Sequence, residues 1–158
     1  MHFDAVYYEP ASLDYPLGRQ LREKYAHLPW IPIVSHNRIP AFTSAENRDF
    51  PRLKSHLIVG VRKTHKYVPN HKVSDWLVPY TSSGCRAMCL YCYLVCNYNK
   101  CSYLRLFVNR EQMLDNLIKK SRAASAPQTF EIGSNSDLVL ENMITGNLVY
   151  TIERFARE

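Results

Sequence analysis

All five cysteines of the chain fall between residues 85 and 101, in the stretch GCRAMCLYCYLVCNYNKC that begins at Gly84. An odd number of thiols leaves one cysteine unpaired in any disulfide connectivity within the chain. Cys85, Cys89 and Cys92 have the spacing C-x3-C-x2-C, directly after a predicted strand and a glycine that allows a tight turn. Three thiolates in one short loop suit an iron–sulfur cluster that keeps one iron open to a small molecule.

Zinc is the main alternative ligand for this loop. Cys96 or Cys101 could complete a site of four thiolates, as in structural zinc loops. Zinc loops more often use paired C-x2-C knuckles, so the spacing favours an iron–sulfur cluster. Buried cysteines without a ligand are the third alternative.

The composition of the chain predicts a packed, soluble protein. Its 158 residues with 46% hydrophobic content are enough for a sizeable core. No charged leader followed by an apolar stretch opens the sequence, and no apolar run reaches the roughly 20 residues that span a bilayer. We therefore expect no membrane association and a cytoplasmic location, where reducing conditions disfavour disulfides and favour metal or redox chemistry.

The formal net charge of +6 is unevenly distributed along the chain. No acidic residue lies between Asp49 and Asp75, whereas six basic residues do: Arg52, Lys54, Arg62, Lys63, Lys66 and Lys72. Such a segment could follow a phosphate backbone and release counterions from it. The alternative interpretation is a basic loop exposed to solvent.

Short apolar runs alternate with helical patterns, which predicts an α/β fold. The final helix is expected to be weakened in its middle by Gly146. The expected strands cover residues 5–10, 31–36, 55–63, 76–83 and 129–137. The expected helices cover residues 12–28, 109–124 and 141–158.

The cysteine motif after a strand resembles the radical S-adenosylmethionine (SAM) superfamily. Further segments resemble the spore photoproduct lyases in order and spacing: YYEPASLDYPLG, SHN, LIVGVRKT, GCRAMCLYCYL and FEIGSNSD. These enzymes repair the thymine dimer that ultraviolet light makes in spore DNA. The resemblance covers nearly all of this chain but about the N-terminal half of a typical member. It implies an N-terminal α/β region over residues 1–75, followed over 76–158 by the first two βα units of an incomplete radical SAM partial TIM-type barrel.

The resemblance also implies the cofactors. Cys85, Cys89 and Cys92 would hold a [4Fe-4S] cluster, and S-adenosyl-L-methionine would bind its open iron. One electron from the cluster would cleave the cofactor to a 5'-deoxyadenosyl radical, which takes a hydrogen atom from the lesion. The cross-link between the two thymines then breaks, and one hydrogen must return.

Five further residues are site candidates by this resemblance. Tyr91 and Tyr93 match tyrosines near the family's site, although aromatic packing explains them equally well. Ser134 occupies the position of the family's hydrogen-donating cysteine, yet its O–H bond is too strong for the same role. Either another group donates the hydrogen, with Cys96 and Cys101 as candidates, or the chain does not complete repair. Ser136 and Asp137 could bind SAM, and Asp137 could instead cap the last helix.

The resemblance implies ultraviolet-damaged DNA as a partner and an electron donor such as a flavodoxin or ferredoxin. Arg105 and Lys63 could neutralise the cofactor carboxylate or a DNA phosphate, although such residues are more often surface charges. Because only two βα units are expected, a second polypeptide could complete the barrel. Family membership would place the protein in the spore core. The alternative function is a non-catalytic remnant that binds an iron–sulfur cluster or zinc.

Overall fold

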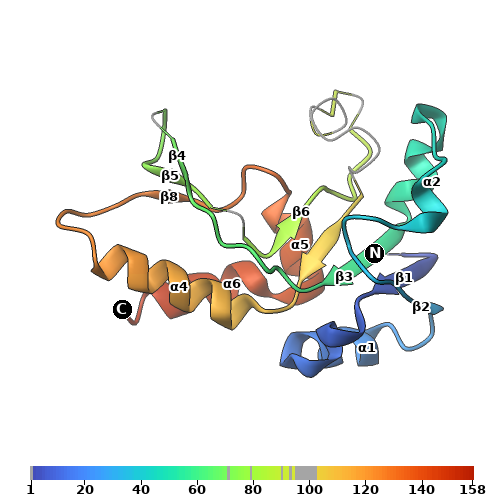
Figure 1. Ribbon diagram of the computed structural model, residues 1–158, viewed down its shortest axis with the longest axis horizontal. Coiled ribbons are helices and arrows are strands. Elements are labelled where there is room, and N and C mark those ends of the chain that lie inside the picture. Colours follow the sequence, from blue (N-terminus) through green and yellow to red (C-terminus); the bar gives the residue numbers. More distant parts are fainter. Residues whose placement is uncertain (1, 71, 79, 90, 93, 95–102) are drawn as a thin grey trace.

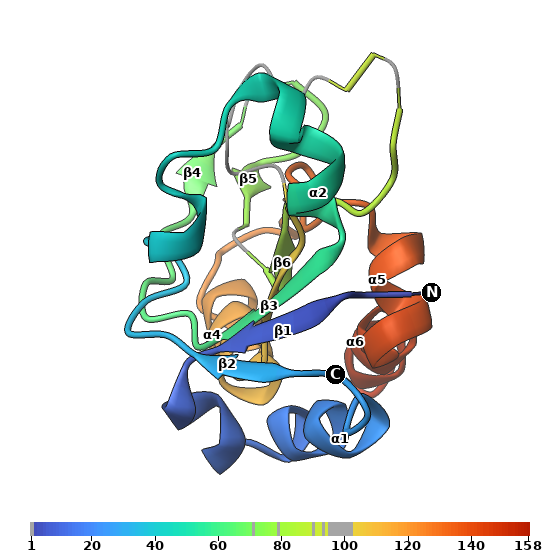
Figure 2. The same cartoon turned by 90° about the vertical axis from the view of Figure 1, so that its right-hand side faces the viewer.

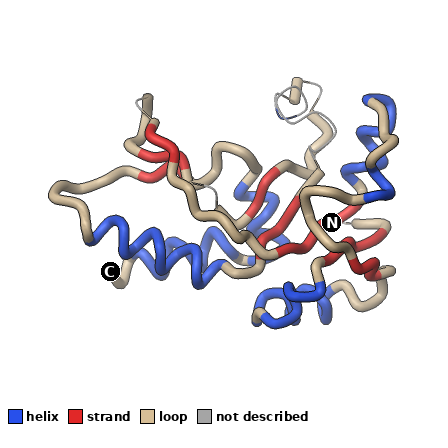
Figure 3. The backbone as a smooth tube through the Cα atoms, in the orientation of Figure 1, coloured by secondary structure: helices blue, strands red, loops and turns tan. Residues whose placement is uncertain are grey.

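The computed structural model describes residues 2–158 except 71, 79, 90, 93 and 95–102 (Figures 1 and 3). The described α-helices are α1 (Pro16–Lys24), α2 (Phe50–Lys54), α4 (Arg110–Arg122), α5 (Leu138–Thr145) and α6 (Asn147–Phe155). Short 3-10 helices are η1 (Pro10–Asp14), η2 (Pro40–Phe42) and η3 (Asn47–Asp49). The strands are β1 (Ala5–Tyr8), β2 (Trp30–Pro32), β3 (His56–Gly60), β4 (Val68–Pro69), β5 (Trp76–Leu77), β6 (Ser82–Ser83), β7 (Arg105–Phe107) and β8 (Phe130–Glu131).

A five-stranded sheet with the order β2-β1-β3-β7-β6 forms the centre of the molecule. Its first four strands are parallel, and β6 pairs antiparallel to β7. The carboxyl ends of β2, β1 and β3 therefore meet at one edge, which is where open α/β sheets place ligands. Strands from both sides of the expected boundary at residue 75 share this sheet.

The central sheet is buried on both faces, because side chains of successive residues point to opposite sides. Val6 and Leu57 pack on one face with apolar residues of α1, which lies below the sheet in Figure 2. Tyr7 and Ile58 pack on the other face with Phe42 and the segment before α2. The α/β class expected from the sequence is confirmed by this arrangement.

The run expected as one strand over residues 76–83 forms two strands in different sheets. Strand β5 pairs with β4 and β8, whereas β6 belongs to the central sheet. Pro79 stands in the middle of this run and cannot donate a ladder hydrogen bond. The two stretches still run beside residues 130–136, because β5 pairs parallel to β8 and Gly84 forms a parallel bridge with Ser136.

The last helix begins earlier than expected, and at Gly146, where the sequence predicts only a weakening, it is divided into two helices. The carboxylate of Asp137 accepts a hydrogen bond from the Leu140 amide at 2.9 Å, so α5 starts at Leu138 rather than at residue 141. Gly146 adopts a left-handed conformation with φ of 68° and separates α5 from α6. Strand β7 had not been predicted.

Helix α4 covers 13 residues and buries Met113, Leu114, Leu117 and Ile118, as its sequence pattern predicts. It lies alongside α6, to the left of the central sheet in Figure 1. Within the described residues, no helix has the length and apolar character needed to cross a membrane.

Candidate active site

Two cavities lie on either side of the turn that follows β8. One, the cysteine pocket, measures about 410 Å³ and is lined by Cys85, Cys89 and Cys92 together with Ser136 and Asp137. The other, the basic cavity, measures about 460 Å³, and its lining includes Ser134 and Asn135 of the same turn. Residues 134–137 therefore contribute to both cavities.

The backbone brings the cysteine pocket together by pairing two loops. Gly84 has a positive φ of 74°, and its amide donates a hydrogen bond to the Asn135 carbonyl at 2.8 Å. The chain turns there from β6 into the cysteine loop. Cys85 is thereby placed beside the turn that carries Ser136 and Asp137.

The three cysteines of the pocket differ in exposure, and none forms a disulfide. Cys85 is buried, Cys92 is half-buried and Cys89 is exposed. Burial raises the pKa of the Cys85 thiol, although the Ala87 amide, 3.2 Å from its sulfur, and the Lys54 ammonium oppose this effect. Among the residues that the structure describes, no set of three His, Cys, Asp or Glu side chains is arranged as a metal site.

The donor set nevertheless suits a thiolate-bound metal group. All three motif sulfurs belong to residues that line one pocket, and soft sulfur ligands are those that iron–sulfur clusters and zinc prefer. The rest of the pocket is largely apolar, with Ala87, Leu94 and Leu138 in its wall.

The cysteine loop is attached to the N-terminal part of the chain by two basic side chains. The Arg86 guanidinium donates to the carbonyls of His2 and Lys54. The Lys54 ammonium donates to the Ala87 carbonyl. Lys54 is fully buried, so this member of the basic segment belongs neither to a solvated loop nor to a DNA-facing surface.

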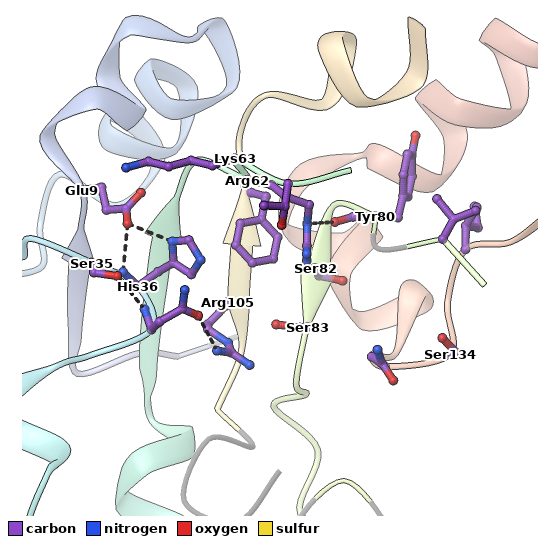
Figure 4. A pocket seen from close by; sticks show the side chains of 16 residues that line it. Glu9, Ser35, His36, Arg62, Lys63, Tyr80, Ser82, Ser83, Arg105 and Ser134 are labelled. Atoms are coloured by element: carbon purple, nitrogen blue, oxygen red, sulfur yellow. Dashed lines mark hydrogen bonds and ion pairs between the residues drawn. The ribbon is translucent and has the colours of Figure 1, made fainter. Parts of the chain in front are cut away.

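The basic cavity lies near the carboxyl ends of β1 and β3 (Figure 4). Glu9 accepts hydrogen bonds there from the amides of His36 and Val61, both at 2.9 Å, and its carboxylate lies 2.8 Å from Nδ1 of the His36 ring. Burial by itself would raise the pKa of Glu9, but these hydrogen bonds and the nearby imidazole hold it below its ordinary value. Burial, with the neighbouring Arg105 and Arg62, lowers the pKa of His36 despite the attraction of Glu9.

Three basic side chains, those of Arg62, Lys63 and Arg105, line this cavity. The Arg62 guanidinium stacks on Phe107 at 3.9 Å and donates to the Tyr80 carbonyl. Among the described residues nothing accepts a hydrogen bond from the buried Nε of Arg105. Glu9 is the sole acidic residue of the described lining and is already engaged, so the cavity favours an anionic or carbonyl-rich ligand.

Hydroxyl groups form the wall opposite His36: Ser82, Ser83 and Ser134 (Figure 4). Behind this wall lies Glu141, which is 1% exposed and accepts hydrogen bonds from the Ser82 hydroxyl and, at 2.6 Å, from the Asn147 amide. Burial raises the pKa of Glu141, and the Ser82 hydrogen bond partly offsets the rise.

The residues expected at the site lie in the cysteine pocket, in the basic cavity or outside the described part of the chain. Cys85, Cys89, Cys92, Ser136 and Asp137 share the cysteine pocket, whereas Ser134 faces the basic cavity. The side chain of Tyr91 is 95% exposed although its residue borders the cysteine pocket, so aromatic packing within the described chain does not explain it. The predictions for Tyr93, Cys96 and Cys101 lie outside the described residues.

The candidate functional residues Glu9, His36, Lys54 and Glu141 had not been singled out from the sequence. Glu9 and His36 each follow a short apolar run, which is the position of ligand-binding residues at strand ends. That signal could have identified them. Nothing in the sequence distinguishes Lys54 or Glu141 from surface charges.

Comparison with known proteins identifies the family. The family model for spore photoproduct lyase matches residues 1–158. The chain belongs to the spore photoproduct lyase family. The spore photoproduct lyase of Bacillus subtilis is 34% identical over 158 residues, covering 96% of this chain and 45% of the relative. The Geobacillus lyase is 33% identical, covering 94% of this chain and 44% of the relative. The chain thus spans less than half the length of these two lyases.

Solved lyase structures agree with the fold. A spore photoproduct lyase complexed with dinucleoside spore photoproduct superposes with a TM-score of 0.86 at 31% identity, over 96% of this chain and 45% of that one. A mutant lyase with bound AdoMet and dinucleoside spore photoproduct also gives 0.86, at 30% identity and the same coverage. Both of those structures hold dinucleoside spore photoproduct, and the second also holds AdoMet.

Proposed function

We propose that the chain takes part in radical SAM repair of the spore photoproduct in DNA. The observation that carries the proposal is the adjacency of the two cavities. A single turn, residues 134–137, borders both a three-cysteine pocket and a basic cavity lined by hydroxyl groups. A cofactor held in the first would lie next to a ligand held in the second. Such proximity is the requirement for a radical to reach its substrate.

Cys85, Cys89 and Cys92 would hold a [4Fe-4S] cluster, with S-adenosylmethionine beside it. When bound, these groups supply the 5'-deoxyadenosyl radical, which is the difficult part of the chemistry. The protein's own contribution is to orient the ligands and exclude water. Ser136 and Asp137 line the cysteine pocket and would contact the cofactor, although the Asp137 carboxylate also caps α5.

The basic cavity would hold the damaged dinucleotide. Arg62, Lys63 and Arg105 provide positive charge for a phosphate, and Arg105 has a buried N–H with no acceptor in the described chain. Ser134 lies on the opposite wall. By the resemblance to the family it would stand at the position of the hydrogen-donating cysteine. The hydroxyl is a poor hydrogen-atom donor, so the returning hydrogen would come from another group.

The parallel pairing of β5 with β8 and of Gly84 with Ser136 supports the view that these stretches are the first two strands of a partial barrel. A flavodoxin or ferredoxin would supply the electron. Ultraviolet-damaged DNA would be the substrate.

Anaerobic reconstitution tests the proposal. We expect about four irons and four sulfides per chain, as in other [4Fe-4S] proteins, and reductive cleavage of S-adenosylmethionine by the reduced protein. Repair of a spore-photoproduct dinucleotide to thymidines would then establish the substrate. Binding of one zinc without sulfide would instead indicate the remnant. A cluster that does not cleave the cofactor would likewise refute the catalytic proposal.

A further inference from the structure

The side chain of Lys54 is unusual for this chain, because it carries a charge but is fully buried. It is 0% exposed and lies at the C-terminal end of α2. Its ammonium donates to the carbonyl of Ala87, midway between Cys85 and Cys89. Its own backbone carbonyl accepts from Arg86 at 3.0 Å. Both ends of one residue therefore bind the cysteine loop, which lies at the same end of the sheet as α2 in Figure 2.

This buried ammonium has no carboxylate partner in the described chain. All 14 acidic residues belong to the described part, and none forms an ion pair with Lys54. The Phe50 ring, 4.7 Å from the ammonium, compensates for only part of the lost hydration. A buried charge without a counter-charge is strongly unfavourable. The arrangement therefore requires a negative group that the side chains of the described residues do not supply.

The cysteine pocket is where such a negative group would form. The Lys54 charge is close enough to act electrostatically on the Cys85 thiol. Three thiolates around a doubly charged iron–sulfur cube, or around one zinc ion, carry a net negative charge. On one-electron reduction the cluster becomes more negative still, so a fixed nearby cation stabilises its reduced form more than its oxidised form.

We propose that Lys54 is a positioning residue and counter-charge for the thiolate-bound metal group of the cysteine pocket. Its hydrogen bond to Ala87 fixes the backbone between two metal-binding cysteines, and its charge makes the bound cluster easier to reduce. The cluster identity rests on the proposed function. The need for a negative group near Lys54 does not, because it follows from the burial of an ammonium that no described carboxylate pairs with.

Lys24 offers a matched control. Its ammonium also donates to backbone carbonyls, those of Met143 at 3.2 Å and Ile144 at 2.8 Å. These carbonyls lie near the end of α5, where a lysine is favoured by the helix dipole. Lys24 lines neither cavity. Removing its charge therefore tests the general effect of losing an ammonium that binds carbonyls.

The experiment compares Lys54→Met, Lys54→Arg and Lys24→Met with the parent in the full chain, after anaerobic reconstitution. Iron and sulfide are counted first, and the midpoint potential is then measured by a redox titration followed by electron paramagnetic resonance, without S-adenosylmethionine. We expect Lys54→Met to be harder to reduce by about tenfold in the equilibrium constant, or ~59 mV for one electron. Lys54→Arg should lie close to the parent, and Lys24→Met should match it.

A Lys54→Met protein that loads as the parent does and keeps its midpoint potential would overturn the proposal. If Lys54→Met fails to load iron, Lys54→Arg decides. If Lys54→Arg loads iron and has the midpoint potential of the parent, the result supports a requirement for charge. If Lys54→Arg does not load iron, the site requires the shape of lysine rather than its charge, and the counter-charge role is refuted.

Failure of the proposed function would be visible separately, as a parent chain that takes up no iron. The zinc affinity of the same variants, measured by competition with a chromophoric chelator, then tests Lys54. We expect about tenfold weaker zinc binding in Lys54→Met than in Lys24→Met, because one unit of nearby positive charge is lost. Equal affinities would refute the role of Lys54.

Discussion

The cysteine pocket and the basic cavity share a turn but are assembled in different ways. The three cysteines come from eight consecutive positions, 85–92, and only the turn at 133–138 and Leu94 complete the described lining. The basic cavity takes its residues from segments around 9, 35, 62, 80, 105 and 134. A local motif supplies the three cysteines of the cysteine pocket. The basic cavity, in contrast, exists only once the parallel sheet has formed. Substitutions in the cysteine motif should therefore abolish binding of the metal group. Substitutions in the basic cavity should weaken DNA binding by degrees.

The largest expected effect is loss of the metal group from the cysteine pocket. Cys85→Ala, Cys89→Ala and Cys92→Ala should each abolish the brown absorbance of the reconstituted protein, because a cluster left with two motif thiolates is not retained. Cys96→Ala and Cys101→Ala should keep it. Equal loss in Cys96→Ala or Cys101→Ala and in Cys89→Ala would indicate a site of four thiolates, as expected for zinc.

A graded effect is expected in the basic cavity. Changing Lys63 and Arg105 together to glutamine should weaken binding of damaged DNA by about tenfold and lower the salt slope by roughly two, about one for each phosphate contact. The matched control changes Arg38 and Lys119, which do not line the cavity, to glutamine. The affinity of both double variants and the parent for damaged DNA is measured by fluorescence anisotropy across a salt series. Parallel slopes for all three proteins would show that the cavity binds no phosphate.

A substitution at Ser134 tests whether the two cavities work together, because Ser134 belongs to the turn between them. If the chain, alone or with a partner, cleaves the cofactor, Ser134→Cys should raise the ratio of thymine to adduct severalfold. The reason is that a weak S–H bond then faces the substrate radical. Chromatography of the products measures the ratio, and the rate of cofactor cleavage should not change. A constant ratio in a cleavage-competent preparation would mean that Ser134 does not occupy the hydrogen-return position.

The same contrast explains which features the sequence could predict. The cysteine spacing, helix α4 and the weak point of the last helix at Gly146 depend on neighbouring residues, and all could be predicted from local patterns. Strand β7 has only three residues and is specified by its pairing with β3. The burial of Lys54 and Glu141 depends on contacts with residues 33 and 59 positions away. No periodicity within a short window can indicate such contacts.

The smallest expected effect concerns Glu141, which lies behind the wall of the basic cavity. Because burial raises its pKa, the folded protein binds this proton more tightly than the unfolded chain does. The stabilisation is complete below the unfolded value of 4.5 and is lost as the pH rises through the folded pKa. Glu141→Gln removes the titration and keeps groups that can bond to Ser82 and Asn147. At neutral pH we therefore expect the variant to be more stable by about 1 kcal/mol.

Urea unfolding at a series of pH values measures this difference. Subtracting the parent from the variant cancels the other titrating groups that both share, among them His36, whose lowered pKa makes stability fall as the pH drops below its unfolded value of 6.5. Glu153→Gln, at an exposed position of α6, controls for loss of a negative charge. The Glu141→Gln difference should grow between pH 4.5 and neutrality and should exceed the Glu153→Gln difference at neutral pH. A flat Glu141→Gln difference would mean that Glu141 titrates alike in both states. The hydroxyl wall of the basic cavity would then not depend on a buried acid.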